Sequence, residues 1–120
     1  MHADTPAGRP IITVYDTLQQ RKVPLQPLFP DEIRMYVCGP TVYDLAHIGN
    51  ARPLVAFDVV ARHLRARGYR VTFVRNITDV DDKIMDRARE SGRPIDAITA
   101  ETTKAYHDDM DALNALRPTI

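Results

Sequence analysis

The alternation of apolar and polar positions is clearest in the middle of this chain, where two apolar segments flank a longer helical pattern. Residues 33–38 form an apolar-rich run that stops at Gly39-Pro40, and residues 71–74 form a second run, so both predict strands. From residue 53 to about 67, apolar side chains recur at steps of three and four, which predicts a helix with one buried face. The side chains expected on that face are Leu54, Phe57, Val60, Ala61 and Leu64.

The ends of this helix are marked by residues with distinctive backbone preferences. Pro53 suits a first helical turn, where its missing N–H costs nothing, and Gly68 suits the residue that ends a helix. A strand, a helix and a strand within this length predict a βαβ unit, with parallel strands and a right-handed crossover. The pattern therefore indicates an α/β fold.

The flanking segments predict shorter elements. Residues 1–10 predict a disordered leader, residues 11–15 a short strand, and the prolines at 24, 27 and 30 an extended connection without regular structure. Residues 84–90 predict a short helix closed at Ser91-Gly92. A last helix is expected from Pro94 to Arg117-Pro118, with one side formed by Ile95, Ile98, Thr102, Ala105, Met110 and Leu113.

Composition narrows the class of protein. The 120 residues allow one domain at most, expected over residues 11–120. The 16 basic and 16 acidic residues leave no basic surplus of the kind that coats nucleic acid, although surfaces outside this chain could hold tRNA. No apolar run approaches the roughly 20 residues of a membrane span, and the single cysteine, Cys38, cannot form an internal disulfide. A cytoplasmic protein without a membrane partner is expected.

A ligand is expected at the loop between the first of the two strands and the helix, because open parallel sheets bind ligands beyond the carboxyl ends of their strands. Residues 39–52 lead into a helix start, whose free N–H groups and positive dipole end favour an anion. Gly49 allows the backbone to approach a ligand, and His47 and Asn50 can donate hydrogen bonds to phosphate oxygens. A plain connecting loop with a capping Asn fits the composition equally well.

Specific motifs in and beyond this loop carry a resemblance to a known family. The segment His47-Ile48-Gly49-Asn50 resembles the HIGH signature of class I aminoacyl-tRNA synthetases, with asparagine in place of the second histidine. Residues 35–44, MYVCGPTVYD, are similar to the MYVCGxTVYD stretch of cysteinyl-tRNA synthetases, and residues 74–83, VRNITDVDDK, resemble that family's VRNITDxDDK segment. The resemblance extends from Ile12 to the last residue, including the DALN of residues 111–114 with Arg117-Pro118.

This resemblance implies a Rossmann-like parallel sheet with flanking helices, the N-terminal half of a class I synthetase catalytic domain. It implies a cysteine–tRNA ligase, which forms cysteinyl-adenylate from cysteine and ATP with Mg²⁺ and then esterifies tRNA(Cys). His47 and Asn50 would be catalytic, with His47 stabilising charge on the α-phosphate; Asn50 can donate a hydrogen bond but cannot become cationic. The implied ATP-binding residues are Gly39, Pro40, Thr41, His47, Ile48, Gly49 and Asn50.

The resemblance also implies a zinc site. It makes Cys38 a zinc ligand and places Cys38, Gly39, Thr41 and Thr78 at the bound cysteine. Zinc needs four ligands, and the family supplies the others from later residues, so Cys38 would be the one ligand present here. On composition alone, Cys38 would be a buried, inert thiol, and His63 and His107 would be surface residues. Asp79, Asp81 and Asp82 suit a helix N-terminus better than a magnesium site.

Several alternatives stay open. The family's KMSKS-type loop has no counterpart here, so we expect a truncated product that is inactive alone. A related cysteine–aminosugar ligase of mycothiol synthesis shares the zinc and ATP chemistry, but the TVYD of residues 41–44 favours the tRNA enzyme, because the sugar ligase is expected to carry a proline near residue 42. A fragment that binds a nucleotide or a partner chain without catalysis is the non-enzymatic alternative.

Overall fold

The computed structural model describes residues 8–120, so most of the predicted leader lies outside the described residues. At the start of this range, Arg9 contacts the body of the molecule. Its guanidinium forms an ion pair with Asp31 at 2.9 Å, donates a hydrogen bond to the Gly68 carbonyl at 3.0 Å and lies over the ring of Tyr69. None of the helices within residues 8–120 has the length and apolar character needed to cross a membrane.

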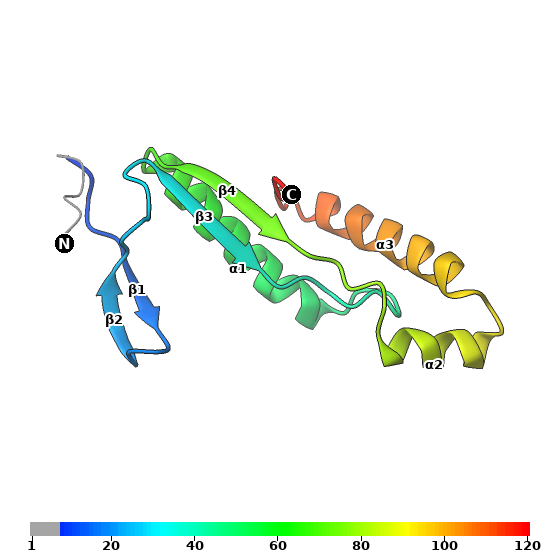
Figure 1. Ribbon diagram of the computed structural model, residues 1–120. Helices are drawn as coiled ribbons and strands as arrows, with labels where there is room; N and C mark the ends of the chain where they lie inside the picture. The colour runs from blue at the N-terminus through cyan, green and yellow to red at the C-terminus, as the bar shows by residue number, and fades with distance from the viewer. Residues whose placement is uncertain (1–7) are drawn as a thin grey trace.

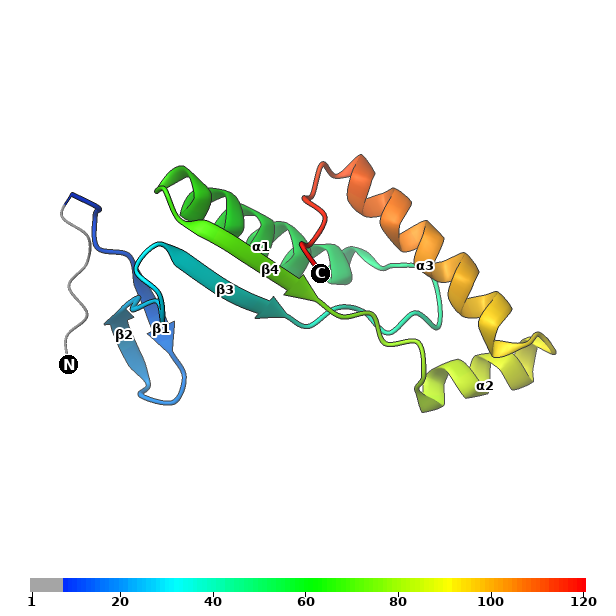
Figure 2. The ribbon, with the colours of Figure 1, turned by 45° about the horizontal axis from the view of Figure 1, so that its top comes forward.

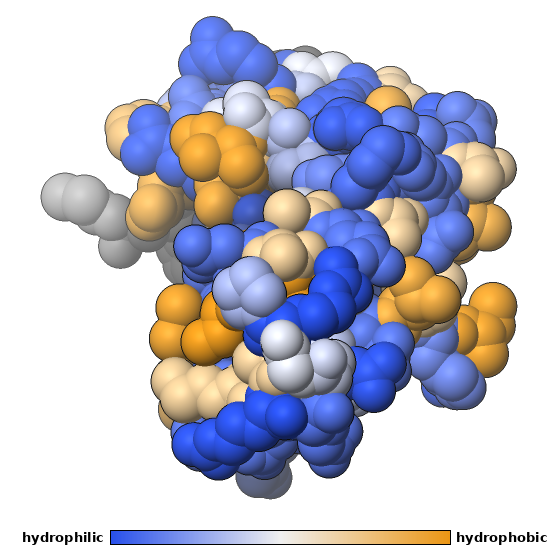
Figure 3. Space-filling model, turned by 90° about the vertical axis from the view of Figure 1, so that its right-hand side faces the viewer, coloured by the Kyte–Doolittle hydropathy of each residue, from blue (hydrophilic) through white to orange (hydrophobic). Residues whose placement is uncertain are grey.

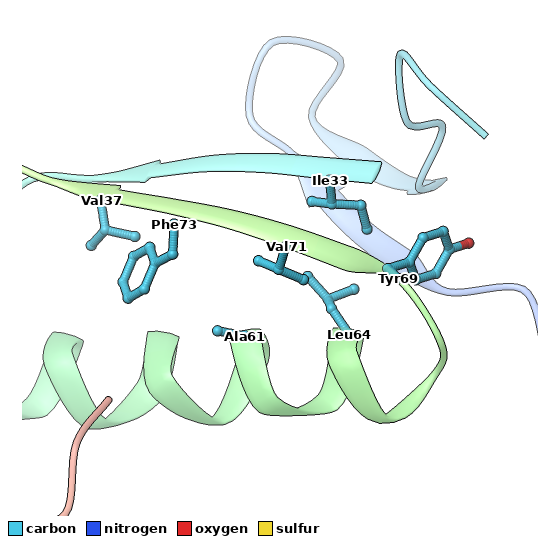
Figure 4. Close-up of a cluster of buried hydrophobic side chains, with 7 residues drawn as sticks. All are labelled: Ile33, Val37, Ala61, Leu64, Tyr69, Val71 and Phe73. Atoms are coloured by element: carbon cyan, nitrogen blue, oxygen red, sulfur yellow. The ribbon is translucent and has the colours of Figure 1, made fainter. Parts of the chain in front are cut away.

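The predicted βαβ unit is confirmed and forms the centre of the molecule (Figure 1). Strand β3 (Glu32–Val37) leads through a loop into helix α1 (Ile48–Ala66), and β4 (Arg70–Arg75) returns parallel to β3, with Glu32 opposite Arg70 and Val37 opposite Arg75. Both strands turn one face to α1 (Figure 4), where a buried cluster forms from Ile33, Val37, Ala61, Leu64, Tyr69, Val71 and Phe73. The fold is α/β, and its parallel sheet has two strands within the described residues.

Helix α1 begins five residues before the predicted start at Pro53. His47 caps the helix, so Pro53 lies inside it and leaves the Gly49 carbonyl without its usual i+4 N–H partner. The predicted buried face is wrong at two positions, because Phe57 and Val60 are 40% and 42% exposed. Asp58 is buried instead, where its carboxylate accepts hydrogen bonds from the Leu116 N–H at 2.8 Å and from Arg62 at 2.9 Å.

The contacts of Asp58 predict a measurable stability effect. Asp58→Ala would leave the Leu116 N–H without its acceptor, so we expect the free energy of unfolding to fall by about 2 kcal/mol. Asp58→Asn keeps an acceptor and should cost less. Urea unfolding measures both, with Asp86→Ala as the control, since the exposed Asp86–Arg89 pair should contribute less than about 1 kcal/mol. Equal effects of Asp58→Ala and Asp86→Ala would contradict the structural role.

An antiparallel hairpin precedes the βαβ unit. Strand β1 (Thr13–Asp16) overlaps the predicted strand of residues 11–15, but it begins two residues later and ends one residue later. The expected irregular connection is wrong at its start, where β2 (Arg21–Pro24) pairs with β1. Pro24 is tolerated because it occupies the end of the ladder, and the Leu25 N–H bonds the Ile12 carbonyl just beyond it. The carboxylate of Asp16 accepts the Leu18 and Gln19 N–H groups and shapes the turn.

Two helices follow β4. Helix α2 (Asp82–Ser91) begins two residues before the predicted start and ends at Gly92, as predicted. The φ of Gly92 is 65°, in the left-handed region that favours glycine. Helix α3 (Ile95–Ala112) ends before the predicted Arg117-Pro118, because Asn114 adopts a left-handed φ of 56°. Its buried side chains are Ile98, Thr102, Tyr106 and Met110, whereas Leu113, predicted on the same side, is exposed.

The molecule is extended. The hairpin and α2 lie at opposite ends in both ribbon views (Figures 1 and 2), and the principal extents are 59 × 30 × 22 Å. The radius of gyration is 17.9 Å, against about 14 Å for a compact domain of this length. Figure 3, seen from the end that carries α2, shows apolar side chains at the surface among polar ones. Much apolar surface is therefore uncovered, including Val55 and Val59 on α1.

Candidate functional site

The carboxyl end of β3 lies directly beside the carboxyl end of β4. Cys38 follows β3 with its thiol exposed, so the buried-thiol interpretation is wrong. The next N–H, of Gly39, donates to the Asn76 side-chain oxygen at 2.8 Å, and a Cβ at residue 39 would lie 1.7 Å from the Asn76 carbonyl oxygen. Gly39 is therefore required by the close approach of two chain segments.

A second contact holds the loops together beyond the strands. Thr41 and Thr78 form an isolated parallel bridge, in which the Thr78 N–H donates to the Pro40 carbonyl at 3.0 Å and the Val42 N–H to the Thr78 carbonyl at 3.1 Å. The Thr102 hydroxyl of α3 donates to the Val42 carbonyl at 2.7 Å. The loop after Cys38 is thus fixed by β4 on one side and α3 on the other.

His47 is the N-cap of α1, and this position sets the chemistry of its ring. Its Nδ1 accepts the Gly49 N–H at 3.0 Å, so the neutral ring carries its proton on Nε2. Asn50 completes a reciprocal capping box, since its side-chain oxygen accepts the His47 N–H at 2.8 Å. The capping interpretation is therefore confirmed. Within residues 8–120, the Nε2–H of His47 and the amide NH₂ of Asn50 have no hydrogen-bond acceptor.

Two adjoining hollows lie around these caps. The thiol hollow is lined by Cys38, Gly39, Pro40, Gly49, Asn50, Pro53 and Leu54. The histidine hollow, of about 230 Å³, is lined by residues 40–47 together with Asn50, Lys83 and Tyr106. Pro40 and Asn50 border both. The predicted positions of Cys38 at a strand's carboxyl end and of His47 at the helix N-terminus are confirmed, but the two side chains line neighbouring hollows instead of one pocket.

Some of the other predicted site residues line one of the two hollows, and some line neither. Thr41 lines the histidine hollow, and Gly39 and Gly49 line the thiol hollow. Thr78 is held in the bridge to Thr41 and lines neither hollow, and Ile48 is 78% exposed and lines neither.

Sequence reasoning missed three residues that shape the site. Asn76 holds Gly39, the Lys83 ammonium lies over the Tyr43 ring at 5.4 Å, and Tyr106 closes the histidine hollow from α3. Burial raises the pKa of the Tyr106 hydroxyl while Arg75 opposes that rise, so the phenol stays a neutral donor near pH 7. Asn76 follows β4 as Cys38 follows β3, so the strand-end rule applied to both strands would have found it.

The residues fit a zinc ion only in part. Cys38 offers one exposed thiol, and among residues 8–120 no group of three His, Cys, Asp or Glu side chains is arranged to hold a metal ion. Asp81 caps α2, as the helix-terminus interpretation predicted, by accepting the Lys83 N–H at 2.9 Å. His63 is exposed as predicted, whereas His107 is half-buried against Tyr106.

Comparison with known sequences decides the family. Residues 24–120 match the family described as the tRNA synthetases class I (C) catalytic domain. The chain belongs to this family. It is 57% identical over 109 residues to a cysteine–tRNA ligase of Rhodospirillum centenum, and the aligned region covers 91% of the chain and 24% of that relative. It is 54% identical over 111 residues to one of Neisseria meningitidis, covering 92% of the chain and 16% of the relative.

The chain therefore spans about a quarter or less of the curated class I synthetase relatives it matches. The matched region contains β3, α1, β4, α2 and α3, and with them both hollows.

Proposed function

We propose that this chain supplies the part of a cysteine–tRNA ligase site that activates cysteine with ATP. The observation that carries the proposal is the capped start of α1, where unused donors of His47 and Asn50 stand at a positive helix end beside a hollow. Relatives at 54–57% identity carry the name cysteine–tRNA ligase, which favours the tRNA enzyme over the aminosugar ligase.

In the proposed reaction, a carboxylate oxygen of cysteine attacks the α-phosphorus of ATP as the bond to the β-phosphate oxygen breaks and pyrophosphate leaves. Negative charge grows on the α-phosphate oxygens in the transition state, where fixed donors act most strongly. Nε2–H of His47 and the Asn50 amide would donate to these oxygens. Magnesium would accompany ATP, and the cysteinyl group would then pass to tRNA(Cys). Because this chain has no net positive charge, we propose that surfaces outside it bind the tRNA.

The exposed thiol of Cys38 supports a role at the substrate end, in the thiol hollow with Gly39. As a thiolate, Cys38 would be one of the zinc ligands, with the other protein ligands supplied by polypeptide outside this chain and one of the four positions left for the substrate. A bound zinc ion would hold a thiolate substrate and so select against serine.

The proposal is tested by a chimera in which this chain replaces the matching 109 residues of the Rhodospirillum centenum relative. We expect cysteine-dependent ATP–pyrophosphate exchange from the chimera and none from the 120-residue chain alone, because the chain lacks the rest of the site. A folded but inactive chimera would contradict the proposed function. Exchange by the chain alone would contradict the view that the site is shared with other polypeptide.

A further inference from the structure

A single cationic side chain borders the two hollows. Lys83 lines the histidine hollow, and within residues 8–120 it is the only lysine or arginine that lines either hollow. Lys83 is exposed, and its ammonium lies over the ring of Tyr43, another lining residue, at 5.4 Å from the ring centroid. The attraction between the cation and the ring favours a position of the ammonium at the wall of the hollow.

The backbone of Lys83 is fixed at the start of α2. Its N–H donates to the Asp81 carboxylate, the cap of α2, at 2.9 Å, and the next residue, Ile84, is fully buried. Lys83 therefore lies in the first turn of α2, where the positive end of the helix dipole disfavours a cation. The helix gains nothing from a lysine at this position, whereas an anion in the hollow would offset the repulsion.

The carboxylates near Lys83 do not pair with its ammonium. Asp79, Asp81 and Asp82 lie within four residues of it in the sequence, but no ion pair within residues 8–120 includes Lys83. Asp44, the one acidic residue lining the histidine hollow in the described part of the chain, accepts the N–H of the next residue at 2.8 Å. An ammonium has three donors and no acceptor, so all three remain available to a ligand.

The same hollow is lined by other donors without acceptors. These are the Nε2–H of His47 and the amide NH₂ of Asn50, both at the start of α1. An ammonium beside such donors matches the oxygens of an anion. A lysine binds phosphate as a point charge, without the paired geometry that an arginine uses for a carboxylate.

We propose that Lys83 binds the part of ATP that leaves as pyrophosphate. The inference rests on the proposed activation reaction, in which His47 and Asn50 donate to the α-phosphate. The remaining charge of the triphosphate lies on the β- and γ-phosphates, and Lys83 is the cation of the same hollow. As the bond between the α-phosphorus and the β-phosphate oxygen breaks, negative charge grows on the leaving pyrophosphate, which the ammonium stabilises.

Inorganic pyrophosphate is the probe for Lys83 in the 120-residue chain. In the ¹⁵N-labelled chain, the backbone N–H resonances of Gly49 and Lys83 should move and saturate as pyrophosphate is added, and not with chloride at equal ionic strength. Lys83→Met should weaken binding at least about tenfold, because a charged donor is lost, and Lys83→Arg should retain most of it. Asp44→Asn, which removes the carboxylate from the hollow, should strengthen binding. Lys104→Met, which removes an exposed lysine of α3, should leave it unchanged.

Exchange kinetics of the chimera test the same residue during the reaction. Lys83→Met should raise the KM for pyrophosphate and for ATP at least about tenfold. The KM for cysteine should stay the same, because the ammonium contacts the phosphates and not the amino acid. A KM for pyrophosphate that does not rise, or a KM for cysteine that rises as much, would overturn the assignment.

Failure of this inference and failure of the proposed function give different results. Pyrophosphate that does not saturate the chain below about 50 mM, or that binds equally well to Lys83→Met, would overturn the role of Lys83 even when the chimera is active. A folded chimera without exchange, together with a chain whose pyrophosphate binding depends on Lys83, would contradict the proposed function and support Lys83 as the pyrophosphate ligand.

Discussion

Gly39→Ala is expected to lower the free energy of unfolding by at least about 3 kcal/mol, which is enough to unfold much of a marginal chain. The added Cβ would lie 1.7 Å from the Asn76 carbonyl oxygen and 2.9 Å from its carbonyl carbon. Because the obstacle is backbone, no side-chain rotation relieves it. The two strands would have to separate where their carboxyl ends meet, which also breaks the bond from Gly39 to the Asn76 side chain.

The effect of Gly39→Ala is measured by urea unfolding followed by circular dichroism. Gly92→Ala is the matched control, since Gly92 has open space around its Cβ position and a φ of 65°. It should cost only about 1 kcal/mol, from the left-handed backbone alone. If both alanines cost the same, Gly39 is not constrained by the contact with Asn76.

His47→Ser is expected to reduce cysteine-dependent exchange by the chimera about 100- to 1,000-fold, as for loss of one donor to transition-state charge. Serine is a preferred N-cap, so its hydroxyl can still accept the Gly49 N–H while the Nε2–H donor is lost. Stability should therefore change little while the rate falls steeply.

His63→Ser is the control for this substitution, because His63 is exposed in the last turn of the same helix. It should leave the exchange rate unchanged. If the chimera keeps its exchange rate after His47→Ser, the role of His47 is only to cap the helix. The same conclusion follows if the exchange rate falls only in proportion to a loss of folded protein.

The βαβ unit could be predicted from the sequence because its pattern is local. The extent of α1 could not be predicted in the same way. Proline is common in the first turn of a helix, so Pro53 predicts a start there, whereas the helix is capped earlier, at His47. The buried face of α1 was misjudged because apolar side chains occur on several sides of the helix. The burial of Asp58 could not be predicted from local pattern, because its carboxylate accepts the N–H of Leu116, which is distant in sequence.

The part of the site that directly follows β3 could be predicted from the sequence. The part that depends on contacts between elements distant in sequence could not. Cys38, His47 and Asn50 lie in one continuous segment with a recognisable pattern. Asn76 could have been found by the same strand-end rule, because it follows β4, whereas Tyr106 reaches the region from α3 through a tertiary contact that residue spacing does not encode.

The parallel pairing of β3 with β4 also has a consequence for how the chain folds. Every residue of Glu32–Val37 meets a partner 38 positions further along, so no short-range pair can form first and guide the next. Closing such a loop costs about 3 kcal/mol beyond a constant term before any ladder bond forms. The 19 residues of α1, about 28 Å when helical, more than span the roughly 20 Å of each six-residue strand. Early formation of α1 would replace a flexible connection with a rigid one that holds the two strands near each other. The strands would then pair in a single cooperative step.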